Sequence, residues 1–352
     1  MPWHVLIAAL LTALPLSAAA KPMTIRGEGP PPEHQVFGGN AWRLFLEGEI
    51  EADSGDRLES FIRQNNIPEH SWVYFNSPGG NLAGGISLGR VIRAHGLLSN
   101  IGTLPRPKDR SQGECYSACA LAFLGGKFRF VTPGSKYGVH RFSFTRDGID
   151  KEGLAQAVSA LIVSYLREMD VDSKLFNLAS VTAPSEMRVL QAAELEQLNV
   201  VNNGTTRAKW TIESTTRPDG MYLKGERETV HGINKFLVVC PANEPAFLHI
   251  IFDPQGREDE VLQMNVETLW IDEAAIRVET MRINKTVHNG WINVVYPLSV
   301  GIREALLKAR ESVGLGLRWR ADSGLFLGFE KMPFRDGASK LPGFLRVCGQ
   351  RN

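Results

Sequence analysis

The 352-residue sequence has no surplus of charge of either sign, because 39 lysines and arginines face 38 aspartates and glutamates. Proteins that bind nucleic acid through its phosphates carry basic patches, so we predict no nucleic-acid partner. After residue 20 the sequence also lacks an apolar run long enough to span a membrane. Its length predicts two domains, and its 43% hydrophobic and 22% charged residues are ordinary for a globular protein.

Cysteine is scarce, with four residues in all. Cys115 and Cys119 match half of some zinc sites, but the sequence has no second half-site of the CxxC or HxxxH type. We therefore predict no metal and no cofactor. Four cysteines allow three disulfide pairings. We favour Cys115 with Cys119 and Cys240 with Cys348, because each bond then stays within one domain.

The N-terminus has the features of an export signal. Residues 5–20 are apolar but too short to span a bilayer comfortably, and they end in three alanines that suit a signal peptidase. No Lys or Arg precedes them, so a retained anchor is the alternative. We predict a cleaved signal peptide over residues 1–20 and a periplasmic or secreted protein, in which disulfides persist. Residues 21–41, rich in Pro, Gly and charge, are expected to form a flexible leader.

The hydrophobic patterns of the two halves differ. Strand-like and helix-like segments alternate after Trp42, in WRLFLEGEI, RLESFIRQN and WVYF, which predicts a parallel α/β sheet. From residue 204 short alternating segments are separated by Gly, Pro and Asp. We therefore predict an α/β domain over residues 42–203, followed by a smaller β-rich α+β domain over residues 204–352.

The segment GECYSACALAFLGG, residues 113–126, contains the first candidate catalytic residue. Its pattern predicts a turn that leads into a helix, with Ser117 at the helix start. Unpaired backbone N–H groups and the helix dipole can stabilise a negative charge there, as an acyl-transfer enzyme requires beside its nucleophile. Serine is also a common helix cap, which is the structural alternative.

Two further segments supply what a serine nucleophile needs, namely a base and backbone donors for the oxyanion. His140 ends a predicted strand and is the candidate base. The NSPGG turn offers the N–H of Gly80, and the N–H of Ala118 directly follows the serine. Taken alone, NSPGG is a tight-turn sequence and His140 can be a structural histidine.

In order and local context these segments resemble the Clp protease proteolytic subunit family within the Clp-crotonase fold. The likeness covers about residues 42–202 and rests on FLEGEI, YFNSPGGNLAGG, CYSACALAFLGG, YGVHRF and LQAAELEQLNVVN. It implies a repeated ββα superhelix for the first domain. It also implies a serine peptidase that cleaves peptide or protein substrates through an acyl-enzyme on Ser117, with His140 as base and Gly80 and Ala118 as oxyanion donors.

The third catalytic residue departs from the family pattern. Where the family has an acid, residues 183–188 read APSEMR, with Met187 near the expected place. Glu186 is the candidate substitute, although neighbouring helical residues point about 100° apart. A dyad, with His140 oriented by a backbone carbonyl or by water, is an equal alternative. A catalytically inactive envelope protein for binding or assembly and a crotonase-type acyl-CoA enzyme are the alternative functions.

The resemblance also bears on partners. Cytosolic members work with an ATP-driven unfoldase, and since ATP is not expected outside the cytosol, we predict no such partner. Related folds assemble through faces like the apolar stripe from Leu154 to Met169, which is compatible with a homo-oligomer. A bond between Cys115 and Cys119 would make the turn at Ser117 more rigid. The second domain, which the family lacks, is expected to select substrate or dock a partner.

Overall fold

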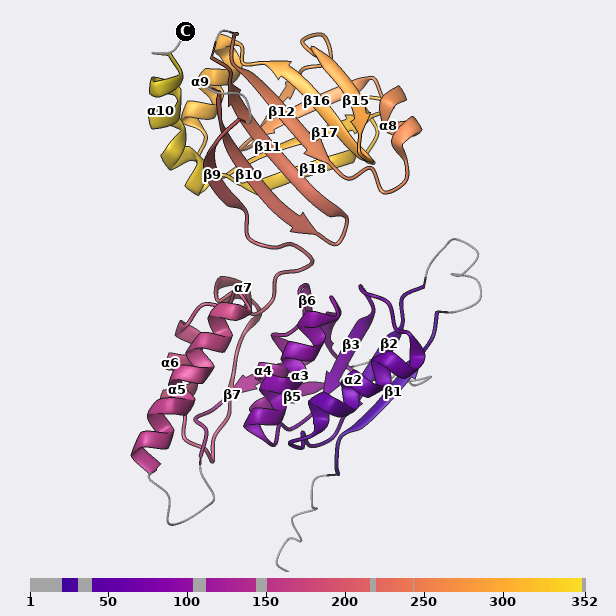
Figure 1. The fold of residues 1–352 in the computed structure, drawn as a ribbon, viewed down its shortest axis with the longest axis vertical. Coiled ribbons are helices and arrows are strands. Elements are labelled where there is room, and N and C mark those ends of the chain that lie inside the picture. Colours follow the sequence, from indigo (N-terminus) through magenta and orange to yellow (C-terminus); the bar gives the residue numbers. More distant parts are fainter. Residues whose placement is uncertain are drawn as a thin grey trace, which may run out of the picture. The chain divides into compact units, whose positions relative to one another are not determined.

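The computed structural model describes residues 21–30, 40–103, 112–143, 151–215, 220–242 and 244–349. The chain divides into two compact units, Met1–Val201 and Asn202–Asn352, whose elements are labelled in Figure 1. The predicted mixed α/β class is confirmed. The predicted signal peptide lies outside the described residues. Within the described ranges, no helix has both the length and the apolar character to cross a membrane.

A five-stranded sheet forms the centre of the first unit, and all its neighbouring strands are parallel except the first pair. Helix α2 (Ser54–Asn65) connects β2 to β3 and helix α3 (Leu82–Ala94) connects β3 to β4, so the predicted strand-helix-strand order is present. In spatial order the strands are β1 (Thr24–Glu28), β2 (Arg43–Glu47), β3 (Trp72–Asn76), β4 (Leu98–Ile101) and β6 (Arg129–Val131).

Strand β1 corrects the expectation of a flexible leader over residues 21–41. Thr24 pairs with Glu47 and Glu28 with Arg43, so the segment extends the sheet antiparallel to β2. Met23 is buried and Ile25 packs against the core. The prediction was wrong here because two apolar side chains suffice to hold a short edge strand, whereas the Pro-rich composition belongs to the residues that follow. Residues 31–39 lie outside the described part.

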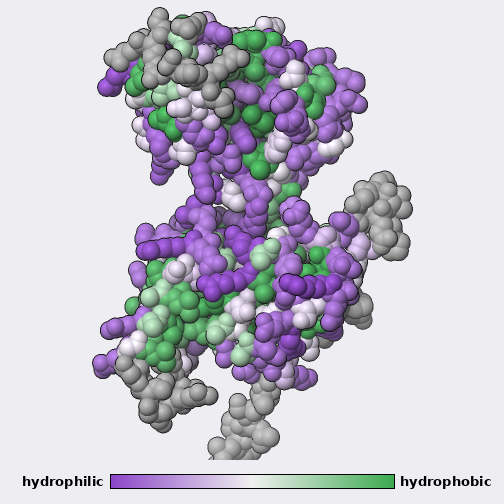
Figure 2. Space-filling model, in the orientation of Figure 1, coloured by the Kyte–Doolittle hydropathy of each residue, from purple (hydrophilic) through white to green (hydrophobic). Residues whose placement is uncertain are grey.

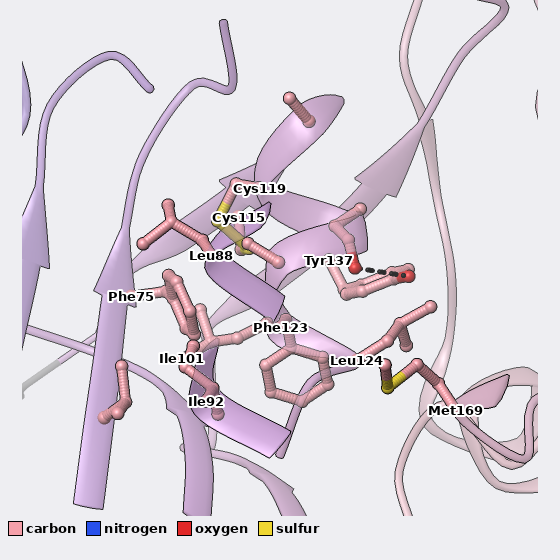
Figure 3. Packing of buried hydrophobic residues seen from close by; sticks show 14 of the residues in the cluster. Phe75, Leu88, Ile92, Ile101, Cys115, Cys119, Phe123, Leu124, Tyr137 and Met169 are labelled. Carbon is pink, nitrogen blue, oxygen red and sulfur yellow. Dashed lines mark hydrogen bonds between the residues drawn. A yellow bond between two sulfur atoms is a disulfide. The ribbon is translucent and has the colours of Figure 1, made fainter. Parts of the chain in front are cut away.

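A second, three-stranded sheet lies beside the first and carries the candidate site. Its order is β5 (Glu114–Tyr116), β7 (Lys136–Val139) and β8 (Arg188–Val189), with β5 and β7 parallel. The short helix α4 (Ala118–Phe123) follows β5 directly. Its Phe123 packs with Phe75 and Tyr137 in the core of the unit, as Figure 3 shows.

The described part of the first unit contains three further helices, α5 (Lys151–Glu168), α6 (Lys174–Val181) and α7 (Ala192–Gln197). The predicted apolar stripe of α5 is buried at Ile162, Tyr165 and Leu166, whereas Leu161 is 40% exposed. Hydrophobic side chains gather on the face of the unit that carries α5 and α6 (Figure 2).

The second unit contains two antiparallel sheets. The larger consists, in spatial order, of β15 (Asn284–His288), β16 (Trp291–Pro297), β12 (Phe247–Phe252), β11 (Gly232–Cys240), β10 (Met221–Thr229) and β9 (Lys209–Ser214). The smaller consists of β14 (Ala274–Arg277), β13 (Val266–Ile271), β17 (Ser312–Arg318) and β18 (Leu327–Pro333). Both contribute to one apolar core, as do the helices α8 (Glu258–Gln263), α9 (Val300–Lys308) and α10 (Arg335–Gly349).

Candidate active site

Ser117 is the single residue between β5 and α4. Its backbone has φ 56° and ψ −121°, a combination that residues other than glycine rarely adopt, and the chain turns sharply there from strand to helix. Its N–H donates to the carbonyl of Gly138 at 3.1 Å. The Ser117 side chain makes no capping hydrogen bond, so a capping role does not explain this serine. A strained strand-to-helix turn is, by contrast, the setting in which α/β-hydrolases expose their nucleophile.

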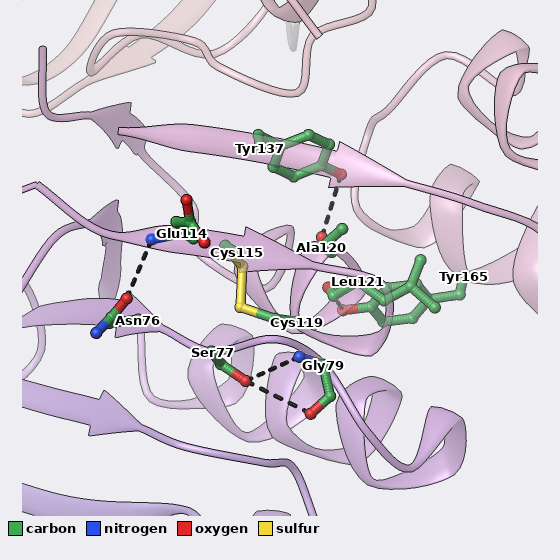
Figure 4. The surroundings of a disulfide bond; sticks show 10 residues. All are labelled: Asn76, Ser77, Gly79, Glu114, Cys115, Cys119, Ala120, Leu121, Tyr137 and Tyr165. Carbon is green, nitrogen blue, oxygen red and sulfur yellow. Dashed lines mark hydrogen bonds between the residues drawn. A yellow bond between two sulfur atoms is a disulfide. The ribbon is translucent and has the colours of Figure 1, made fainter. Parts of the chain in front are cut away.

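The glycine turn after β3 brings a second backbone segment against Ser117. Gly79 and Gly80 have φ 105° and 132°, values that favour glycine. A Cβ on Gly79 would lie 2.7 Å from Ser117 Cβ and 3.1 Å from the Ala118 nitrogen. The turn is fixed in part by Ser77, whose Oγ accepts a hydrogen bond from the Gly79 N–H at 3.1 Å (Figure 4). Glycine at position 79 is therefore what permits the close approach to the serine.

Among the described residues, the N–H groups of the two predicted oxyanion donors, Gly80 and Ala118, have no backbone acceptor. Gly80 forms a parallel bridge with Ile50, in which Ile50 N–H donates to Gly79 and Asn81 N–H donates to Ile50. The N–H of Gly80 itself therefore points away from that partner. Ala118 is the first residue of α4, so its N–H has no acceptor within the helix. Across the described ranges, no backbone carbonyl accepts from either N–H.

Strand β7 brings His140 to the same place. Tyr116 pairs with Gly138 in the parallel ladder, and Ser117 and His140 each follow the end of their strand. Because neighbouring strands lie about 4.8 Å apart, the two residues are close, and both line one pocket. No hydrogen bond joins Ser117 Oγ to the His140 ring in the described structure. Catalytic hydrogen bonds are often long without substrate and tighten when it binds.

The orientation of the histidine is the open part of the site. The Nδ1 atom of His140 is buried and has no hydrogen-bond partner among the described residues. Buried polar atoms are nearly always satisfied, so this nitrogen is an unusual feature of the described site.

Glu186 is not brought to the other site residues. Its side chain is exposed, it lies in a turn in which its N–H donates to Ala183 at 2.9 Å, and it does not line the pocket. Met187 packs against β7 instead, since a Cβ on Gly138 would lie 2.8 Å from the Met187 sulfur. A thioether, and not the predicted substitute Glu186, thus lies against the strand that leads to His140.

An apolar pocket of about 540 Å³, its open mouth included, lies beside Ser117. Its walls come from α4, α5 and α6, and its polar residues are Ser117, His140, Arg141 and Ser180. The sequence reasoning missed α6, because its eight residues are too few for a helical period to stand out. The adjacent Leu175 and Phe176, followed by Ala179 one turn later, are the signal that could have revealed it.

Two arginines hold the carboxyl end of α4. Arg129 is 1% exposed and donates to the carbonyls of Gly126, at 2.9 Å, and Asn199. Burial lowers the pKa of Arg129 to about 10, so it remains charged at neutral pH. Arg93 donates to the carbonyl of Gly125 at 2.8 Å and to those of its two neighbours. These cations offset the negative end of the helix whose positive end carries Ser117.

Two tyrosines bind the middle of the same helix. Tyr137 on β7 donates its hydroxyl to the Ala120 carbonyl at 3.2 Å, and Tyr165 on α5 donates to the Leu121 carbonyl at 2.8 Å. Figure 4 shows the bond from Tyr137 to Ala120, with Tyr165 lying against Leu121. Burial raises the pKa of both hydroxyls, so they stay protonated as donors. Helix α4 is therefore held by side chains from strands β6 and β7 and from helices α3 and α5.

Both predicted disulfides are present. Cys115 bonds to Cys119 with their Cα atoms 5.2 Å apart, and Cys240 bonds to Cys348 with their Cα atoms 5.8 Å apart. The first pair joins β5 to α4, and the second joins the end of β11 to α10. Because all four sulfurs are oxidised, no cysteine thiolate is available as a metal ligand.

No protein-family model and no curated protein sequence matches this chain. Its function must therefore be inferred from the geometry of the site itself.

Proposed function

We propose that the first unit is an exported, Clp-like serine peptidase that hydrolyses peptides or loosely folded proteins through an acyl-enzyme on Ser117. The observation that carries the proposal is the conformation of Ser117, at φ 56° between strand and helix and against the glycine turn. Such a conformation costs about 1–3 kcal/mol and persists only where the surroundings enforce it. A structural serine at a helix start has no need of it.

The proposed reaction has two halves. Ser117 Oγ attacks the carbonyl carbon of the scissile peptide bond while His140 takes the hydroxyl proton, and the N–H groups of Gly80 and Ala118 donate to the resulting oxyanion. The C–N bond then breaks and His140 returns the proton to the leaving amine. In the second half a water molecule gives a proton to His140 and attacks the ester carbon. The bond from that carbon to Ser117 Oγ then breaks, the acid is released, and His140 returns the proton to Ser117 Oγ.

In this proposal His140 works without a carboxylate. The exposed position of Glu186, and a His140 Nδ1 that none of the described residues contacts by a hydrogen bond, support a dyad over a triad. A water molecule at Nδ1 would fix the tautomer that leaves Nε2 free to accept the serine proton.

The pocket beside Ser117 supports a peptide with an apolar side chain next to the cleaved bond. Leu121, Ile162 and Phe176 are among the apolar side chains of its walls. Burying one Leu-sized or Phe-sized side chain contributes about 1.5–3 kcal/mol, enough to place the scissile carbonyl.

The resemblance to the Clp protease proteolytic subunit family supports a repeated ββα superhelix for the first unit. The two disulfides are compatible with an oxidising compartment, and we propose a periplasmic or secreted location. There, no ATP-driven unfoldase is expected as partner. A homo-oligomer is also part of the proposal, with the α5 stripe as the assembly face.

A fluorophosphonate probe tests the function. The probe is expected to label the wild-type protein and to leave Ser117→Ala unlabelled, while a His140→Ala variant is labelled at least 100-fold more slowly. Undiminished labelling of Ser117→Ala would contradict the proposal.

The second candidate function is an inactive envelope protein for binding or assembly. The observation that favours it is that no residue in the described part of the chain forms a hydrogen bond with His140 Nδ1. A wild-type protein that reacts with neither fluorophosphonates nor peptide substrates, yet retains its fold, would support this alternative.

A further inference from the structure

The Cys115–Cys119 disulfide closes a short ring of backbone that contains Ser117. Cys115 is the middle residue of β5 and Cys119 is the second residue of α4. The three residues between them are Tyr116, Ser117 and Ala118, so the ring contains both the proposed nucleophile and one proposed oxyanion donor. Figure 4 shows the bond lying directly between the strand and the helix.

Strand β5, which contributes Cys115 to the ring, is fixed by hydrogen bonds to its neighbours on both sides. Ser77 N–H donates to Glu114 at 2.7 Å and Tyr116 N–H donates to Ser77 at 3.1 Å, which binds β5 to the segment that leads into the glycine turn. On the other side β5 pairs along its length with β7. Cys115 is thus held between two neighbours.

The arginines and tyrosines described above hold the middle and the carboxyl end of α4, and the disulfide adds a support at its first turn. Helix α4 has six residues, too few to be stable by themselves, and its first turn carries the Ala118 N–H. Both cysteines are 0% exposed, and Figure 3 shows them packed beside Leu88 in the core. Because Ser117 is not glycine, a free first turn would rotate until its φ became negative.

We propose that the Cys115–Cys119 disulfide is a positioning device, which holds Ser117 and the Ala118 N–H in the reactive geometry. The proposal rests on the proposed hydrolase function, but its geometric part does not require activity. Both cysteines act through Ser117 and neither touches the substrate.

The second disulfide provides a matched control. Cys240 and Cys348 form the same bond, are also buried, and lie in the other unit, 108 residues apart in sequence. Replacing both by alanine shows what the loss of a buried disulfide does to the protein when nothing is changed near Ser117.

The geometric part is tested by a double-mutant cycle on stability. Ser117→Gly removes the strain of a positive φ, but the disulfide ring also limits the freedom that glycine gains in the unfolded chain, so Tyr116→Gly, in the same ring but without a positive φ, is measured in both backgrounds to correct for that effect. The unfolding equilibrium constant is measured in urea for Ser117→Gly, for Cys115→Ala with Cys119→Ala, and for the triple variant. Ser117→Gly should lower the unfolding equilibrium constant more in the disulfide-bonded protein than in the alanine pair. We expect the two ratios of the constant, before and after Ser117→Gly, to differ by about fivefold. Equal effects in both backgrounds would overturn the proposal.

The functional part is tested by the kinetics of fluorophosphonate labelling, in which Ser117 Oγ displaces fluoride from phosphorus and its proton passes to His140. For Cys115→Ala with Cys119→Ala we expect kinact to fall at least tenfold with KI unchanged, at a temperature where the variant is fully folded. Cys240→Ala with Cys348→Ala should retain kinact. A kinact within twofold of wild type in the first variant would refute the positioning role.

The two proposals fail separately. If the wild-type protein is not labelled at Ser117, the hydrolase function is wrong, and the stability cycle still decides the role of the disulfide. If the alanine pair does not fold, Cys115→Val with Cys119→Ala refills the volume of the sulfurs, and the same two measurements apply.

Discussion

The close approach of Gly79 to Ser117 gives the sharpest prediction. In Gly79→Ala the new Cβ would start 2.7 Å from Ser117 Cβ, whereas ordinary contact begins at 3.4 Å. One of the two backbones must therefore move by roughly 0.7 Å. A displacement of about 1 Å at a reacting group can cost about 100-fold in rate, so we expect labelling of Ser117 by a fluorophosphonate to slow by about 30-fold to 100-fold.

The same substitution also reduces stability. Alanine at φ 105° costs about 1–3 kcal/mol, and the contact with Ser117 adds to it, so we expect a total of about 2–4 kcal/mol. Urea unfolding of the first unit measures this loss. The labelling rate is compared only under conditions in which the variant is folded.

Gly96→Ala is the matched control in the same unit. Gly96 has φ 61°, but the nearest atom to a Cβ there is the Glu69 Cβ, at 3.3 Å. Gly96→Ala should therefore lose about 1–2 kcal/mol of stability, mainly because alanine is strained in the left-handed conformation. The rate at which Ser117 is labelled should not change. If Gly79→Ala and Gly96→Ala are labelled at rates within threefold of each other, the glycine turn does not govern the position of Ser117 and the reasoning fails.

Three further predictions concern single side chains. Glu186→Gln should leave the labelling rate within twofold of wild type, and a loss above tenfold would establish a triad. Arg129→Met should destabilise the first unit by about 3–5 kcal/mol in urea, because several buried carbonyls lose their donor, and a loss below 1 kcal/mol would contradict this account. Burial lowers the pKa of His249, so its contribution to stability is present above the unfolded value near 6.5 and is lost as pH falls below it. The urea midpoint of the second unit should therefore fall between pH 7.5 and pH 5.5, and by less in His249→Gln.

Much of the fold follows from local pattern. The order of strands and helices around Trp42 to Phe75 is visible because each segment repeats its apolar residues with one period. The cysteine pairing follows from the domain division alone. Strand β1 and helix α6 could not be found in this way, since each is short and owes its stability to contacts with distant residues.

The sequence allowed the residues of the candidate site to be predicted, but not their backbone conformation or exposure. Ser117, His140 and the glycine turn can be located from sequence motifs, because nucleophile, base and oxyanion donor each require a particular residue type at a particular position in its segment. The positive φ of Ser117 is different, since nothing in the residue type requires it, and it depends on tertiary contacts: the pairing of β5 with β7, the approach of Gly79 and, as proposed above, the Cys115–Cys119 disulfide. The exposure of Glu186 likewise depends on how the chain returns to β8, which no local pattern reveals.

The buried arginine bears on the order in which the first unit can be completed. Arg129 donates to the carbonyls of Asn199 and Val200, 70 and 71 residues later in the chain and next to the unit boundary. Until that segment is synthesised, the guanidinium lacks two acceptors and the helix behind Ser117 lacks part of its support. Any fragment that ends before Val200 would thus contain the serine, the histidine and the glycine turn, and still leave the unit unfinished.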